Sequence, residues 1–232
     1  MPKAIKRKLK HRDNEVETEV QDRISDIKKL MREKQKAVIM YGAVAGIIVA
    51  VVVGLLIYKY TSDEKARQLE YEAYKIYHNE YQKTPLSKQE QFSRAATLFQ
   101  QAYAKNKSPR LLLYLSSCYA ALERYPEATT TLDLFFKNHS GDKSLLPLAY
   151  RQAAGIQLKT GNKAAALQNL DALYKLSGDL FKDLALIESA RILEGDGKKE
   201  EATVKYKELT EKFKDSPFFN EAKAKLGEKK EG

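Results

Sequence analysis

The chain has 232 residues, a single cysteine and a formal net charge of +10. One cysteine excludes an intrachain disulfide. The positive charge is not gathered in one region, because residues 1–36 carry 12 Lys/Arg against 7 Asp/Glu and residues 59–232 carry 29 against 24.

A basic cluster lies near the N-terminus, where residues 3–12 (KAIKRKLKHR) hold six Lys/Arg and no acidic residue. Such a block can attract anionic lipid or RNA, or it can serve as a topology signal. No aromatic residue lies among its cations, so stacking on bases has no support. We favour topology and membrane lipid, and we expect no nucleic-acid partner.

Residues 13–36 are expected to form a helix with an apolar stripe. The stripe positions, spaced 4-3-4, are Val20, Ile24, Ile27 and Met31, and Val16 extends them. About two heptads are too short to assign a coiled coil. Three interpretations stay open: a dimer seam through residues 16–31, a helix on the membrane surface, and a helix docked on a partner.

Residues 37–58 contain no charge over 22 residues. A helix of about 20 apolar residues spans a bilayer core. The apolar run is longer than the core of a signal peptide and no small-residue cleavage site follows it, so we predict a retained transmembrane helix. Cations crowd its N-terminal flank, which predicts a cytoplasmic N-terminus and a C-terminal region across the membrane. Gly42 and Gly46 form a GxxxG pattern that can support homodimer contacts.

The remaining chain is expected to be helical throughout. A stalk helix over residues 59–84 should end at Thr84–Pro85. Residues 85–227 form the predicted repeat domain, and residues 228–232 a disordered tail. Caps and turn glycines predict helices near 88–105, 109–122, 126–138, 145–159, 163–176, 182–194, 198–213 and 217–226.

A repeat organises this domain. An alanine in the second helix of each expected pair recurs at spacings of 33, 38 and 36 residues, and a larger residue follows it at +4. Offsets of four place both side chains on one helix face, where the alanine allows close approach of the paired helix. These repeat-packing residues are Ala95, Phe99, Ala128, Leu132, Ala166, Leu170, Ala202 and Tyr206.

This pattern resembles the tetratricopeptide repeat, a helix-turn-helix unit of about 34 residues that stacks into a solenoid. The best match is residues 112–140, where the family positions are occupied by Leu115, Tyr119, Tyr125 and Ala128. Ser116 stands where glycine is usual. Gly161 and Gly197 match the turn glycine of their units, and Glu123 replaces it in another. The resemblance covers residues 65–226 and implies an all-α solenoid behind a single transmembrane helix.

The whole chain is similar to the bacterial YfgM-type family. The similarity rests on this architecture, on Gly-Lys-Lys-Glu-Glu-Ala at 197–202 and on Phe-Lys-Asp-Ser-Pro-Phe at 213–218. It implies an inner-membrane protein, ancillary to the secretion translocon, whose periplasmic domain passes exported clients to chaperones. The long basic N-terminal tail departs from that family and can have its own partner.

Nothing in the sequence indicates catalysis. The three histidines are His11, His78 and His139, and no His/Cys/Asp cluster has metal-ligand spacing. No glycine-rich phosphate loop or nucleophile elbow occurs. Cys118 lies on an apolar helix face, which indicates core packing. We therefore expect no enzyme, no cofactor and no metal.

Stacked helix pairs leave a concave face lined by the first helix of each pair, and a peptide or partner helix can bind there. Helix phase assigns seven candidate binding residues to this face. The interpretation that these seven are ordinary surface residues with no binding role stays open. They are Tyr114, Ser117, Arg151, Gln152, Gln157, Glu188 and Arg191. We expect a scaffold that assists exported proteins near the translocon; the alternative is a tether that recruits an envelope-assembly or cell-division complex.

Overall fold

The computed structural model describes residues 10–80 and 86–227, and these form ten α-helices with no strand among them. The chain divides into two compact units, residues 1–60 and 61–232. The predicted all-α fold is confirmed. Residues 3–9 of the basic cluster, Thr84–Pro85 and the tail 228–232 lie outside the described residues.

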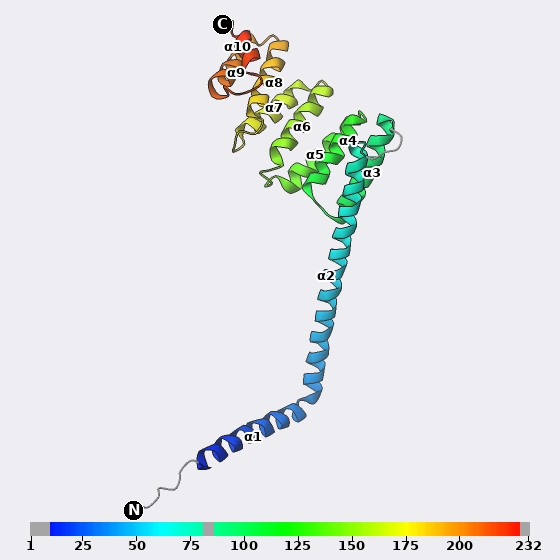
Figure 1. The fold of residues 1–232 in the computed structure, drawn as a ribbon, viewed down its shortest axis with the longest axis vertical. Coiled ribbons are helices and arrows are strands. Elements are labelled where there is room, and N and C mark those ends of the chain that lie inside the picture. Colours follow the sequence, from blue (N-terminus) through cyan, green and yellow to red (C-terminus); the bar gives the residue numbers. More distant parts are fainter. Residues whose placement is uncertain (1–9, 81–85, 228–232) are drawn as a thin grey trace, which may run out of the picture. The chain divides into compact units, whose positions relative to one another are not determined.

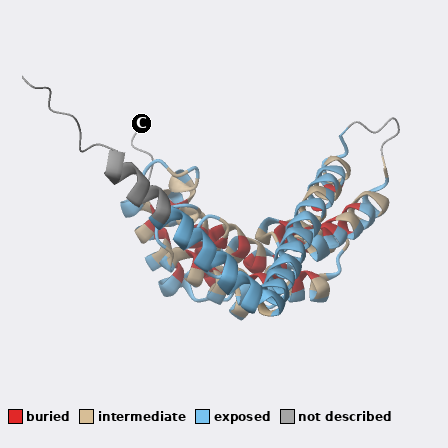
Figure 2. Ribbon diagram, turned by 90° about the horizontal axis from the view of Figure 1, so that it is seen from below, coloured by how far each residue is buried: buried red, intermediate tan, exposed pale blue. Residues whose placement is uncertain are grey.

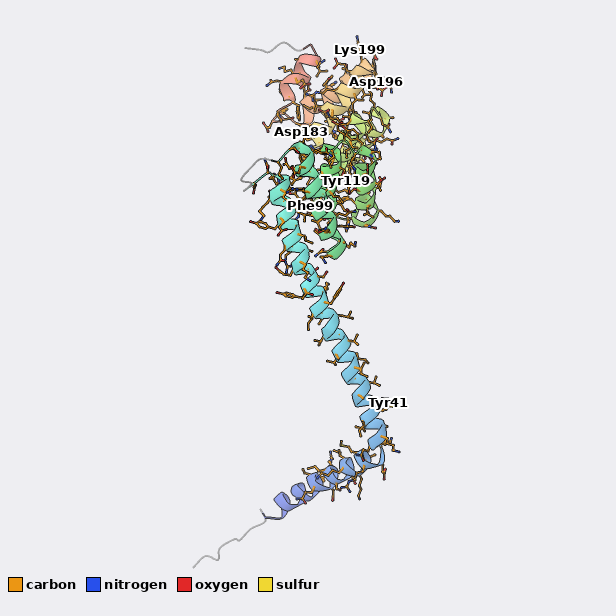
Figure 3. The ribbon with its side chains drawn as sticks, turned by 90° about the vertical axis from the view of Figure 1, so that its right-hand side faces the viewer. Tyr41, Phe99, Tyr119, Asp183, Asp196 and Lys199 are labelled. Carbon is orange, nitrogen blue, oxygen red and sulfur yellow. The ribbon has the colours of Figure 1, made fainter. Side chains whose placement is uncertain are left out.

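The first unit contains α1 (Lys10–Glu33) and the apolar part of α2 (Gln35–Tyr77), with Lys34 between them. No residue of the run 37–58 is buried; Ile47 is 64% and Leu55 is 62% exposed. Leaving one such side chain in water costs about 1.5–3 kcal/mol relative to burying it. Of the described helices, α2 alone is long and apolar enough to cross a membrane. Tyr41 marks this part of α2 in Figure 3.

The C-terminal part of α2 belongs to the repeat unit, where Ala66 and Ala73 are buried. The helix ends at Tyr77, before the stop predicted at Thr84–Pro85. Asn79 adopts a left-handed φ of 55°, and the Glu80 N–H donates to the Lys75 carbonyl at 2.8 Å. This is the Schellman stop, which asparagine can form in place of glycine. The prediction was wrong here because it relied on proline and glycine as stop signals.

Eight further helices complete the second unit. They are α3 (Lys88–Lys105), α4 (Pro109–Ala121), α5 (Tyr125–His139), α6 (Leu146–Lys159), α7 (Lys163–Lys175), α8 (Lys182–Gly195), α9 (Lys199–Lys212) and α10 (Phe219–Lys225). The end of α2 pairs with α3, and α4/α5, α6/α7 and α8/α9 form the next pairs, so that α10 follows the last pair (Figure 1). Each boundary lies within two residues of its predicted position.

The cores of the pairs are built on the recurring alanines. Figure 2 shows the buried residues concentrated in the helices of this unit. The eight repeat-packing residues are all at most 3% exposed. The alanines bring the second helix of each pair close to the first, and Phe99, Leu132, Leu170 and Tyr206 fill the space one turn further along.

Ser116 shows how tightly the α4/α5 pair packs. Its side chain is fully buried, and its hydroxyl donates to the Ala128 carbonyl at 2.9 Å. A buried hydroxyl needs such a partner, because burying it unpaired is costly. Ser116 stands where the repeat usually has glycine. Its hydroxyl is accommodated there because it donates a hydrogen bond to the backbone of the facing helix α5.

The turn inside each pair has the same backbone conformation. Glu123, Gly161 and Gly197 have φ of 60°, 76° and 78°, and Asn79 occupies the corresponding place after α2. After α4, the Arg124 N–H donates to the Tyr119 carbonyl at 2.8 Å, which is the same Schellman bond. A left-handed conformation costs a residue with a Cβ roughly 1–2 kcal/mol. Glu123 therefore carries strain that glycine would not.

We expect Glu123→Gly to raise the free energy of unfolding of residues 61–232 by about 0.5–1 kcal/mol. Part of the relieved strain is offset by the larger entropy of glycine in the unfolded chain. Urea unfolding followed by circular dichroism measures the change. Glu123→Ala is the matched control, since alanine removes the same carboxylate and keeps the strain. Equal stabilisation by both variants would show that the carboxylate, and not the backbone, is unfavourable.

Candidate partner-binding groove

A groove of about 720 Å³ lies along the first helices of three successive pairs. It begins at Tyr77 of α2 and continues over one face each of α4 and α6. Its lining residues are Tyr77, Arg110, Leu113, Tyr114, Ser117, Ala120, Ala121, Tyr125, Leu145, Leu148, Arg151, Gln152, Gly155, Ile156 and Lys159. A volume of this size suits a few side chains of a bound segment.

Stacked aromatic rings form one end of the groove. The Tyr114 ring lies parallel to the buried Phe99 ring with 5.1 Å between centroids, and Tyr77 meets Tyr114 edge to face at 5.4 Å. Burial raises the pKa of both tyrosines, and a hydrogen bond with Ser117 partly offsets the rise at Tyr77. Both phenols therefore stay neutral and present apolar ring surface with a polar tip.

A polar contact joins α4 to α6 across the groove. The Gln152 Nε2 group donates to the Leu113 carbonyl at 3.1 Å and to the Ser117 hydroxyl at 2.8 Å. Gln152 therefore fixes the spacing of the two first helices. Its amide supports the groove as well as lining it.

The charge of the groove is one-sided. Arg110, Arg151 and Lys159 line it, and none of its lining residues in the described part of the chain is acidic. Arg110 also pairs with Glu70 at 2.6 Å, and the Arg151 guanidinium lies 5.0 Å from the Phe181 ring centroid. These contacts hold the arginines in place around an apolar floor. The arrangement suits a segment that has apolar side chains and negative charge.

The structure places the seven predicted residues in three locations. Tyr114, Ser117, Arg151 and Gln152 line the groove. Gln157 lines a separate hollow of about 240 Å³ with Thr129, Tyr150 and Asn169, among others. Glu188 and Arg191 contact α10 or each other through ion pairs.

Repeat position explains why some of these residues lie apart. Tyr114, Gln152 and Glu188 each precede the packing alanine of their pair by 14 residues, and Ser117, Gly155 and Arg191 precede it by 11. Glu188 and Arg191 therefore occupy groove positions of the last pair. The sequence analysis missed Gly155, which lines the groove one turn after Arg151, although the same helix phase would have assigned it to this face. Tyr77 was missed because residues 59–84 were assigned to the stalk.

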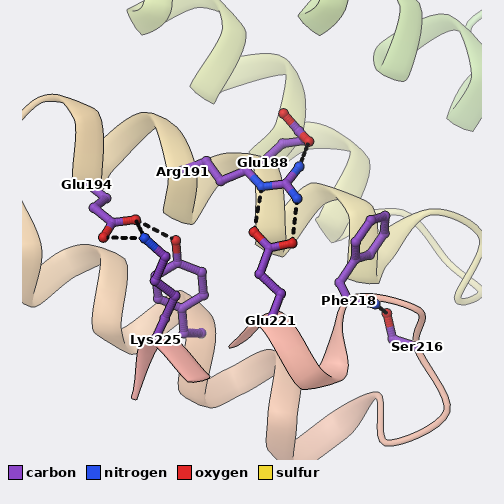
Figure 4. Close-up of polar contacts among 8 residues, drawn as sticks. Glu188, Arg191, Glu194, Ser216, Phe218, Glu221 and Lys225 are labelled. Carbon is purple, nitrogen blue, oxygen red and sulfur yellow. Dashed lines mark hydrogen bonds and ion pairs between the residues drawn. The ribbon is translucent and has the colours of Figure 1, made fainter. Parts of the chain in front are cut away.

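At the C-terminal end, charged residues bind α10 to α8 (Figure 4). The Arg191 guanidinium donates to both carboxylate oxygens of Glu221, at 2.9 and 2.6 Å, and to Glu188 at 2.5 Å. Beside it, Lys225 Nζ pairs with Glu194 at 2.7 Å. The hydrogen bonds from Arg191 lower the pKa of Glu221. Two carboxylates therefore neutralise the Arg191 guanidinium, whereas the Arg151 guanidinium lies over the Phe181 ring at the edge of the groove.

The remaining reactive groups do not gather into a site. Within residues 10–80 and 86–227, no three His, Cys, Asp or Glu side chains could hold a metal ion. Cys118 is fully buried, and burial raises its pKa to about 12, so its thiol stays protonated near neutral pH. His78 packs against the rings of Tyr74 and Tyr77 with centroids 4.2 and 4.9 Å away.

The helix pairs, their small packing residues and the groove on the first helices define a helical-repeat protein. The family model for the tetratricopeptide repeat-like domain matches residues 32–228, and the chain belongs to this family. The match includes the apolar run of α2 as well as the repeats. Comparison with the curated proteins gives no match. Such repeats are typically non-catalytic modules that bind other proteins, so the chain is a candidate protein-interaction scaffold.

We expect Glu221→Gln to increase hydrogen exchange of the α10 amides severalfold at neutral pH. Arg191 holds the folded pKa of Glu221 below its unfolded value, which is about 4.3. The contribution is therefore present above that unfolded pKa and is lost as the pH falls through the lower folded pKa. The pair is partly exposed, so its worth is about 1 kcal/mol or less.

Exchange measured by mass spectrometry at neutral pH and near pH 3 tests this expectation, after correction for the intrinsic exchange rates. The difference between the variant and the original chain should shrink at the acidic pH. Glu211→Gln is the matched control, because Glu211 makes only an exposed pair with Lys207 at 3.8 Å. An equal effect of both variants would assign no special role to the Arg191–Glu221 contact.

Proposed function

We propose that this chain is a membrane-anchored scaffold that binds segments of other proteins in the groove of α2, α4 and α6. The groove carries the proposal: its apolar, aromatic floor lies among three cations, of which Arg110 is paired with Glu70, and none of the described residues that line it is acidic. Apolar anchors with a charged rim are the usual means by which helical grooves bind peptides. The bound segment is an extended or helical stretch with apolar residues and acidic neighbours.

The exposed apolar run of α2 supports anchoring, since its side chains need an apolar environment. The family match begins at residue 32 and therefore includes this run with the repeats. The cations before residue 37 favour a cytoplasmic N-terminus. In a bacterium this topology places the repeat unit in the periplasm, at the outer face of the inner membrane.

The client class follows from that location and from the resemblance to the YfgM-type family. Proteins leaving the secretion translocon are unfolded and expose apolar segments, which the groove suits. We propose that the scaffold binds such clients near the translocon and passes them to periplasmic chaperones. Binding of a single folded complex instead would identify the structural tether that we gave as the alternative.

Gly155 offers a way to block the groove without disturbing the fold. It lies on the exposed face of α6, and a Cβ built there meets nothing within 4 Å. We expect Gly155→Trp to fill the groove and to reduce client recovery at least tenfold, while helix content and unfolding stay unchanged. The measurement is affinity isolation of the full chain from mildly solubilised membranes, with mass spectrometry of the bound proteins.

Gly195→Trp is the matched control, because Gly195 is also an exposed helical glycine with free space and does not line the groove. Translocon subunits, chaperones and exported clients that are lost with Gly155→Trp and kept with Gly195→Trp would support the proposal. Recovery of one envelope or division complex would favour the tether. Unchanged recovery with Gly155→Trp would exclude the groove as the binding site.

A further inference from the structure

The helix α1 has an apolar face that no part of the proposed function uses. Its stripe is exposed along the described residues: Val20 50%, Ile24 46%, Ile27 57% and Met31 55%. Leu30, beside the stripe, is 55% exposed. Such a continuous apolar face on one side of a helix indicates a surface that is covered in the cell.

The charges that border the stripe are positive. If Ile24 and Met31 take heptad position a and Val20 and Ile27 take position d, the flanking e and g positions are Gln21, Arg23, Lys28, Leu30 and Gln35. None of these is acidic. Over residues 19–33, which carry the stripe, the acids fall at the outer c and f positions: Glu19, Asp22, Asp26 and Glu33. Before the stripe, Asp13 and Glu17 stand at d and a in the same register, so the apolar face begins at Val20.

This pattern argues against a two-stranded seam. Coiled coils select their partners through opposite charges at e and g. A parallel pair of α1 helices would place Arg23 opposite Lys28 of the second copy, and an antiparallel pair would find no acidic partner at any e or g position. An anionic surface, by contrast, attracts both cations while the apolar stripe is buried.

The short connection between α1 and α2 indicates which surface covers the stripe. Only Lys34 separates α1 from the helix that carries the apolar run, so α1 lies at the membrane boundary wherever α2 crosses. We propose that α1 is an interfacial helix, bound through Val20, Ile24, Ile27 and Met31 to the anionic leaflet where the run begins. The proposal rests on the crossing of α2 and is independent of the groove.

Spin labels on the full chain, reconstituted in nanodiscs with one chain each, test this position. Cysteines replace Ile24 and Ile27 on the stripe and Asp22 and Lys29 on the outer face, in a Cys118→Ala background. In discs of equal parts phosphatidylcholine and phosphatidylglycerol, labels at 24 and 27 should become accessible to oxygen and protected from a water-soluble nickel complex. Labels at 22 and 29 should stay accessible to nickel.

Charge reversal supplies the matched comparison. Lys28→Glu, beside the stripe, should reduce the oxygen accessibility at 27 severalfold, and Lys29→Glu, which makes the same charge change on the outer face, should have a smaller effect. Pure phosphatidylcholine should weaken the binding of the unmodified helix in the same sense. A label at position 49 reports the crossing of α2.

Three results would overturn the proposal. The first is equal nickel accessibility at all four positions of α1 in anionic discs. The second is spin–spin broadening at 24 and 27 in liposomes without lipid contact in single-chain discs, which would identify a dimer seam. The third is nickel accessibility at position 49, which would remove the crossing on which the proposal rests and leave the groove experiment unaffected.

Discussion

Close approach of paired helices through a small residue is the constraint on which the repeat unit depends. One alanine in each second helix, from Ala95 to Ala202, is at most 2% exposed. A larger side chain at any of these four positions would separate the pair and open its core. On the opposite face of the first helices, the Gln152 amide joins α6 to α4 through the Leu113 carbonyl and the Ser117 hydroxyl, and the groove lies there.

Equivalent repeat positions make different contacts in the groove and at the C-terminal end of the repeat unit. Gln152 and Gly155 on α6 and Glu188 and Arg191 on α8 hold equivalent places before their packing alanines. On α6 the positions line an open groove, and on α8 Arg191 pairs with Glu221 of α10 and with Glu188. Terminal repeats need such a cap because their outer face has no following pair.

The two units satisfy the hydrophobic effect in different ways. The repeat unit buries its apolar side chains between helices, as Phe99 and Phe135 do at 0% exposure. The first unit has exposed apolar residues along α2 and on one face of α1, and its own helices cannot cover them. Of the described helices, α2 alone is long and apolar enough to cross a lipid bilayer, which is an apolar phase of the required thickness.

The sequence by itself determined the helices from α3 onward, their pairing and the tetratricopeptide-repeat family, because these follow from local periodicity, caps and the spacing of alanines along one face. It also assigned Tyr114, Ser117, Arg151 and Gln152 to the first-helix face. Only the tertiary structure decided that Tyr77 lines the groove and that Glu221 of α10 pairs with Arg191. These outcomes depend on contacts between residues far apart in the chain, and helix phase gives the direction of a side chain but not what lies in front of it.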